Sequence, residues 1–155
     1  MKLLHTITLL AFMLATPALA NSSSSTDEHS IKRAVLDYIV SQHKTQPDMF
    51  KRGVDEKLAK RTYWRSKDNK EIVLETSFDT MMRLAKTYNE NGDKFPEKPR
   101  VEIEIFDIDN RVASVKLTVD EWIDYMHLYQ TEKGDWKVIN VLWQFHDESK
   151  QSSVN

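Results

Sequence analysis

The chain has 155 residues and a net charge of −2, because 22 basic and 24 acidic side chains are scattered along it. This length suits one domain with one hydrophobic core, and the lack of a basic stripe interleaved with aromatic residues argues against nucleic acid as a partner. No cysteine is present, which excludes a disulfide framework, a thiol nucleophile and thiolate metal ligands.

Residues 1–20 have the anatomy of a secretory signal peptide. Lys2 precedes an apolar stretch, Pro17 interrupts it, and Ala18-Leu19-Ala20 places small residues where signal peptidase cleaves. The apolar stretch is too short for a transmembrane helix. We therefore expect a cleaved signal, export to the bacterial periplasm or medium, and no membrane contact after cleavage. An uncleaved N-terminal anchor is the alternative.

Two helices are expected early in the folded domain, which we place at residues 30–147. Residues 21–29 are polar and are expected to form a flexible leader. Apolar residues then recur at helical spacing over 31–39, which predicts a helix that ends near His43. Pro47 suits the first position of a short second helix.

A hairpin and a third helix follow. Residues 61–64 and 71–74 are strand-like around a polar turn, although this segment could instead be largely a loop. Residues 78–88 again follow the helical period, and Asn91-Gly92 is expected to end that helix.

The C-terminal half is expected to contain four consecutive strands. Apolar residues alternate with polar ones over 101–105 and 113–119, and residues 122–145 form a hairpin. A long antiparallel meander curls, and helices cover its concave face. The fold class is therefore α+β: a conical half-barrel in which three helices cover a curved antiparallel sheet of about four to six strands. Residues 148–155 are expected to be a flexible tail.

Both alternating sets of residues in the 122–145 hairpin are rich in large apolar side chains. A three-residue loop ending at Gly134 predicts Thr131 opposite Asp135. The same register places Leu128 opposite Val138, Met126 opposite Asn140 and Asp124 opposite Leu142. One set then lines the cone, and the other would leave an apolar patch that a symmetric homodimer buries. The predicted interface residues are Tyr125, His127, Tyr129, Ile139, Val141 and Trp143.

Three runs resemble the "putative lumazine-binding" family of the nuclear transport factor 2-like superfamily. They are Ala113-Ser114-Val115-Lys116-Leu117, Trp122-x-Asp124-Tyr125-x-His127-Leu128 and Gly134-x-Trp136-Lys137-Val138-x-Asn140. The resemblance extends over residues 30–146, and it implies a conical fold with a pocket between helices and sheet, and often a dimer through the sheet's outer face. The superfamily also contains a steroid isomerase, dehydratases and cyclases, so the fold alone does not choose a function.

Asp124 and His127 are the candidate general bases. They are an odd number of residues apart on one strand, so they are expected on opposite faces, which argues against an acid–base pair. Tyr125 and His127 share a face and could hydrogen-bond a ligand or a partner chain. Asp124 could act as a base inside the cone, or it could pair with a nearby Arg, Lys or backbone group.

No metal or cofactor site is expected. The histidines lack metal-binding spacing, the segment 107–110 lacks the glycine and closing glutamate of a calcium loop, and there is no glycine-rich phosphate loop. The aromatic residues would suit a flat or apolar small molecule if the fold gathers them. The predicted ligand-binding residues are Tyr38, Trp64, Trp122, Asp124 and Asn140.

The sequence therefore favours an exported, non-catalytic, homodimeric small-molecule-binding domain. One alternative is an isomerase-, dehydratase- or cyclase-like enzyme that uses Asp124 or His127 as general base. Another is a protein whose sheet face binds a different protein.

Overall fold

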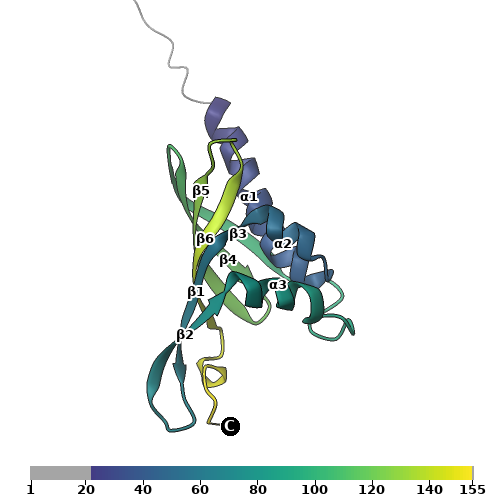
Figure 1. The fold of residues 1–155 in the computed structure, drawn as a ribbon, viewed down its shortest axis with the longest axis vertical. Coiled ribbons are helices and arrows are strands. Elements are labelled where there is room, and N and C mark those ends of the chain that lie inside the picture. Colours follow the sequence, from purple (N-terminus) through teal and green to yellow (C-terminus); the bar gives the residue numbers. More distant parts are fainter. Residues whose placement is uncertain (1–21, 155) are drawn as a thin grey trace, which may run out of the picture.

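The computed structural model describes residues 22–154, in which three α-helices lie on one side of a six-stranded sheet (Figure 1). The helices are α1 (Ser22–His43), α2 (Pro47–Gly53) and α3 (Phe78–Thr87). The strands are β1 (Val54–Arg65), β2 (Glu71–Ser77), β3 (Val101–Asp109), β4 (Val112–Val119), β5 (Trp122–Gln130) and β6 (Trp136–Phe145). Among these residues no helix is both long and apolar enough to cross a bilayer.

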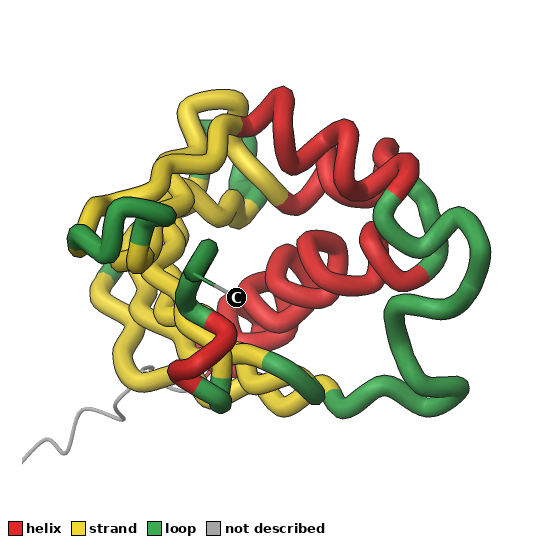
Figure 2. The backbone as a smooth tube through the Cα atoms, turned by 90° about the horizontal axis from the view of Figure 1, so that it is seen from below, coloured by secondary structure: helices red, strands yellow, loops and turns green. Residues whose placement is uncertain are grey.

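The sheet has the strand order β2-β1-β6-β5-β4-β3 and is open at both edges. Four of its neighbouring pairs are antiparallel, whereas β1 and β6 run parallel. The α+β cone is thus confirmed, but the sheet is mixed rather than wholly antiparallel. Figure 2 shows the strands forming one wall and the helices the other.

The helices begin and end where local chemistry allows. Residues 22–29, expected as a leader, belong to α1, whose buried stripe includes Ile31, Val35 and Ile39 as the spacing predicts. Helix α2 begins at Pro47, as predicted, and ends at Gly53. Gly53 packs so closely against α1 that a Cβ atom at this position would lie 2.6 Å from the Ala34 carbonyl oxygen.

Helix α3 begins at Phe78, as the helical period predicts, and ends earlier than expected. The Ser77 hydroxyl accepts a hydrogen bond from the Thr80 backbone N–H, which fixes the first turn. The helix ends at Thr87, and residues 88–100 form a loop before β3. The buried side chains of the helices pack on the concave face of the sheet, where the alternating residues of β4 are all buried: Ala113, Val115, Leu117 and Val119.

The β5–β6 hairpin follows the predicted register only near its turn. The Thr131 N–H donates to the Asp135 carbonyl at 2.8 Å, Gly134 has a φ of 90°, and Leu128 faces Val138, all as predicted. Beyond Val138 the register shifts by one residue, because Ile139 is a β-bulge.

Because of this bulge, the predicted register is wrong for the rest of the hairpin. Met126 faces Val141 rather than Asn140, and Asp124 faces Trp143 rather than Leu142. Since side chains alternate along a strand, a shift of one residue exchanges the faces beyond it. Val141 and Trp143 therefore turn towards the helices, whereas Asn140 and Leu142 lie on the outer face.

The segment after β6 is hydrogen-bonded to β1 and does not extend away as the expected tail. Residues 148–150 form a short 3₁₀ turn, after which the Gln151 carbonyl accepts from the Arg65 N–H at 3.0 Å. The Gln151 side chain is 3% exposed and bonds the Thr62 hydroxyl and the Phe145 N–H. This segment covers the end of the sheet beside Trp143.

Candidate functional site

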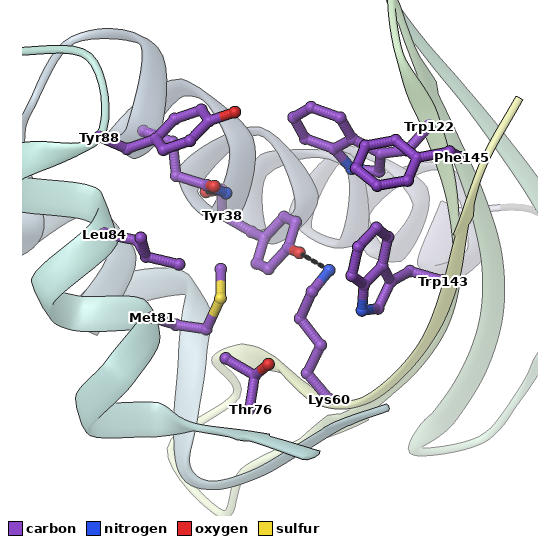
Figure 3. Close-up of a pocket in the computed structure, with 10 residues that line it drawn as sticks. Tyr38, Lys60, Thr76, Met81, Leu84, Tyr88, Trp122, Trp143 and Phe145 are labelled. Carbon is purple, nitrogen blue, oxygen red and sulfur yellow. Dashed lines mark hydrogen bonds between the residues drawn. The ribbon is translucent and has the colours of Figure 1, made fainter. Parts of the chain in front are cut away.

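A cavity of about 220 Å³ lies between the helices and the concave face of the sheet, and we call it the cone pocket. Its wall is largely apolar, with Tyr38 from α1, Met81 and Leu84 from α3, and Trp122, Trp143 and Phe145 from the last two strands (Figure 3). Pockets for drug-sized ligands hold roughly 300–1,000 Å³. The cone pocket therefore suits a molecule of one or two rings.

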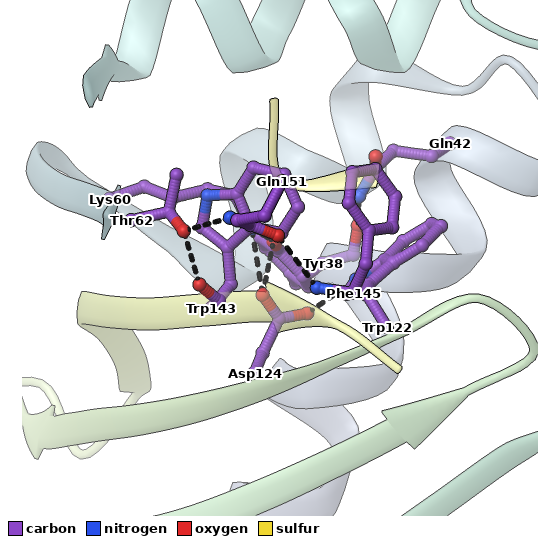
Figure 4. Close-up of polar contacts among 9 residues, drawn as sticks. All are labelled: Tyr38, Gln42, Lys60, Thr62, Trp122, Asp124, Trp143, Phe145 and Gln151. Carbon is purple, nitrogen blue, oxygen red and sulfur yellow. Dashed lines mark hydrogen bonds and ion pairs between the residues drawn. The ribbon is translucent and has the colours of Figure 1, made fainter. Parts of the chain in front are cut away.

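Of the residues that the structure describes, one charged side chain lines the cone pocket. Lys60 extends from β1 to the pocket, where its Nζ donates to the Tyr38 hydroxyl at 2.7 Å and to Asp124 Oδ1 at 2.7 Å. The Trp122 indole N–H donates to the other carboxylate oxygen at 2.9 Å (Figure 4). Lys60 is 7% exposed and Asp124 is 0% exposed, so this is a buried ion pair.

The rings around Lys60 help to hold its charge inside the protein. Its Nζ lies 5.4 Å from the ring centroid of Tyr38 and 4.9 Å from that of Trp143, which are cation–π distances. Burial lowers the pKa of Lys60, and the neighbouring Asp124 opposes that shift. Burial raises the pKa of Tyr38 well above its ordinary value, and the charge of Asp124 adds to the rise, so its hydroxyl remains protonated.

Asp124 is paired with a nearby lysine, which is the structural alternative that the sequence left open. Its carboxylate accepts from Lys60 on one oxygen and from Trp122 on the other. It is not among the residues that line the cone pocket. A general base needs a lone pair within reach of the substrate proton, and this geometry directs both oxygens to protein donors.

His127 lies on the face of β5 opposite to Asp124, as strand parity predicts. It is exposed, and the strand separates it from the cone pocket. The two candidate bases therefore do not form a pair.

The other predicted ligand-binding residues divide into two groups. Tyr38 and Trp122 line the cone pocket. The Trp64 indole N–H instead donates to the Ser153 hydroxyl at 2.8 Å, near the C-terminal segment, and Asn140 is exposed on the outer face. Among the residues the structure describes, no group of three or more His, Asp or Glu side chains is placed to hold a metal ion.

Sequence reasoning missed Lys60 and assigned Trp143 to the wrong face. Lys60 shares strand parity with the buried residues Leu58 and Thr62, but the predicted strand began one residue after it. A strand extended backwards by a few residues would have placed this lysine on the inner face. Trp143 is displaced by the bulge at Ile139, and nothing in the alternation of the sequence marks that bulge.

The outer face of the sheet carries exposed apolar side chains. Leu142 is 59% exposed and lies opposite Tyr125, whose ring stacks on Phe106 at a centroid distance of 6.1 Å. Tyr63 and Val73, which face each other on β1 and β2, are also exposed. We call these five residues the outer patch. Of the predicted interface residues, Tyr125 belongs to it, and Val141 and Trp143 lie inside the cone.

The remaining predicted interface residues lie on or near the outer face. His127 is exposed, whereas Tyr129 and Ile139 are half-buried. The Tyr129 hydroxyl donates to Asp55 Oδ2 at 2.6 Å, which ties that side chain to the start of β1.

Solved structures with the same fold come from several bacteria. An NTF2-like protein of unknown function from Shewanella baltica superposes with a TM-score of 0.61 at 17% identity, covering 81% of this chain and 98% of its own. One from Silicibacter pomeroyi gives a TM-score of 0.60 at 12% identity, covering 79% of this chain and 98% of its own. At such identities the likeness shows the fold alone. No curated protein matches this chain.

A family model described as "putative lumazine-binding" matches residues 26–144. The matched range holds all three helices apart from the start of α1, and all six strands apart from the last residue of β6. It thus contains every residue that lines the cone pocket except Phe145. The chain therefore belongs to the putative lumazine-binding family, and it has the nuclear transport factor 2-like fold.

Proposed function

We propose that this chain is an exported, non-catalytic domain that binds one small, flat and largely apolar molecule in the cone pocket of each subunit of a homodimer. The observation that carries the proposal is the pocket itself: about 220 Å³, lined by aromatic and aliphatic side chains, with a single buried charged group. Concave, mostly apolar cavities with few polar groups are the usual form of small-molecule sites. Family membership and fold support the same class of function.

The geometry favours binding over isomerase-like catalysis. The oxygens of Asp124 are engaged by Lys60 and Trp122, and His127 is on the face of the sheet away from the pocket. Neither candidate base is positioned to take a proton from a bound molecule. The prediction that Asp124 or His127 drives catalysis therefore finds no support in their placement.

The outer patch supports the homodimer. Exposed apolar patches on a folded domain commonly mark interaction sites, and a twofold contact would place the same patch on both subunits. Export is supported by the sequence of residues 1–20, which lie outside the described residues.

Native mass spectrometry of the protein purified from the host's exported fraction tests the whole proposal. We expect a dimer in which each subunit lacks residues 1–20 and retains one small molecule. Leu84→Trp should block the cone pocket and remove that molecule while leaving the dimer intact, since Leu84 lines the pocket and is remote from the outer patch. A bare, unprocessed monomer would contradict the proposal.

A further inference from the structure

The indole nitrogens of the four tryptophans differ in their hydrogen bonding. Those of Trp64, Trp122 and Trp136 donate to Ser153, Asp124 and Asp27 at 2.8, 2.9 and 3.1 Å. Trp143 Nε1 is buried and has no hydrogen-bond partner among residues 22–154. A buried donor without an acceptor costs roughly 1–3 kcal/mol, so such a group is expected to have an acceptor in the working state.

Lys60 also has an unused donor. Its ammonium group carries three protons, and within the described residues it donates to the Tyr38 hydroxyl and to Asp124. A third N–H is thus available at the cone pocket that Lys60 lines.

These two donors belong to the same end of the cone pocket. The Lys60 Nζ lies 4.9 Å from the centroid of the Trp143 indole, and both residues line the cavity (Figure 3). The two side chains are therefore neighbours in the wall of the cavity, and we consider them together as one candidate subsite. The opposite wall, with Met81, Leu84 and Tyr88, offers mainly apolar contact for the rest of a ligand.

The charge balance at this end selects the kind of acceptor. Lys60 is the one charged residue that lines the pocket among the described residues, and Asp124 already neutralises it at 2.7 Å. A carboxylate ligand would add a second anion beside one cation where Lys60 and Asp124 are only 7% and 0% exposed, and burying an uncompensated charge is costly. A neutral carbonyl oxygen accepts hydrogen bonds without that cost.

We propose that Lys60 and Trp143 form a carbonyl-binding subsite, and that the ligand is a flat molecule of one or two rings that bears a neutral carbonyl oxygen. The inference rests on the proposed function and adds the chemical class of the ligand. The lysine supplies a charge-assisted hydrogen bond, and the indole supplies a second donor of fixed direction.

Three probes of similar shape test the subsite: 1-indanone, indane and indane-1-carboxylate. Each is titrated into the ¹⁵N-labelled full chain while the four indole N–H resonances are followed by NMR, with Trp→Phe variants to assign them. We expect 1-indanone to bind about tenfold more tightly than indane, since one good hydrogen bond is worth about that factor. It should also shift the Trp143 resonance most, and indane-1-carboxylate should bind no more tightly than indane.

Variants separate the two donors. Trp143→Phe keeps an aromatic ring and should reduce the preference for 1-indanone over indane to about threefold. Lys60→Met combined with Asp124→Asn removes both charges together and should likewise reduce the preference to about threefold, because the Trp143 indole still donates, while indane still binds. Trp64→Phe serves as the control, because Trp64 is outside the pocket and should leave all three affinities unchanged.

The outcomes distinguish the two proposals. Equal affinity for 1-indanone and indane would overturn the carbonyl subsite and leave the proposed binding function standing. Tightest binding of the carboxylate would likewise overturn the neutral-carbonyl assignment alone. If none of the probes bound and no pocket tryptophan resonance moved, both proposals would fail together.

Discussion

On the inner face of the sheet a lysine and an aspartate are buried side by side, whereas on the outer face Leu142 and Tyr125 are 59% and 45% exposed. Each face thus carries the kind of side chain that usually belongs on the other. A buried charge and an exposed apolar patch are the informative exceptions to the ordinary partition of residues. The inner exception lies at the proposed ligand site, and the outer one lies on the surface that we propose for dimerisation.

Two neighbours on β1 provide the sharpest test, since one lies on each face. Lys60→Met leaves Asp124 buried without its cation and should lower the free energy of unfolding by about 3–5 kcal/mol. Arg61→Met breaks an ion pair with Glu75 in which both side chains are largely exposed, and should cost at most about 1 kcal/mol. Urea denaturation measures both.

The double variant Lys60→Met/Asp124→Asn should recover most of the loss, because no unpaired charge remains and the amide oxygen can still accept from Trp122. A Lys60→Met protein as stable as Arg61→Met would show that the inner pair is not buried as described.

A charge introduced on the outer face of the sheet should weaken the proposed dimer, whereas a charge on the exposed side of α1 should not. Leu142→Glu places a carboxylate in the outer patch and should weaken the proposed dimer about a hundredfold or more, since the charge would be desolvated in both subunits. Leu36→Glu, at an exposed leucine on α1, is the matched control and should leave the dimer unchanged. Sedimentation equilibrium measures the dissociation constants, and equal effects of the two changes would argue against this interface.

The C-terminal segment allows a smaller comparison between two glutamines. Gln151→Ala removes the hydrogen bonds that the Gln151 side chain makes with the Phe145 N–H and the Thr62 hydroxyl. The free energy of unfolding should fall by about 1–3 kcal/mol. Gln144→Ala, on the outer face and half-exposed, should cost less than about 0.5 kcal/mol. Thermal unfolding of the two variants under one set of conditions measures the difference, and similar losses would show that Gln151 adds little.

The smallest expected effect concerns pH. Burial lowers the pKa of His43 below its ordinary 6.5, and Asp120 opposes part of that shift. The unfolded chain therefore binds more protons than the folded one between the two pKa values, so this group's contribution to stability is lost as pH falls through 6.5. His43→Leu should flatten that dependence in urea titrations from pH 7 to 5. An unchanged slope in His43→Leu would contradict the assignment.

Sequence periodicity was sufficient for most of the fold. The alternation over β4, Pro47 at the start of α2 and the glycine at the β5–β6 turn each act over a few residues, so their effects can be predicted locally. Together with the helical periods over 31–39 and 78–88 and the strand-like residues around the turn after residue 64, they predict the three helices, the hairpins at 61–74 and 122–145, and the opposite faces of Asp124 and His127.

The features that were missed depend on contacts between distant parts of the chain. Lys60 and Asp124 are 64 residues apart, and Gln151 reaches a partner 89 residues away. The bulge at Ile139 moves Trp143 into the pocket and Asn140 out of it, although the apolar pattern of β6 is compatible with either register. A single sequence contains no local signal for these arrangements.

The parallel pairing of β1 with β6 has a consequence for how the protein folds. It places Ala59 beside Asn140 and Lys60 beside Val141, and closing a loop of that length is slow compared with forming a hairpin. The ion pair at the cone pocket needs this closure, because Lys60 comes from β1 and Asp124 from β5, beyond β6 in the sheet. We therefore expect the proposed ligand site to form in the last step of refolding, so that binding of a ligand there would report the fully folded chain.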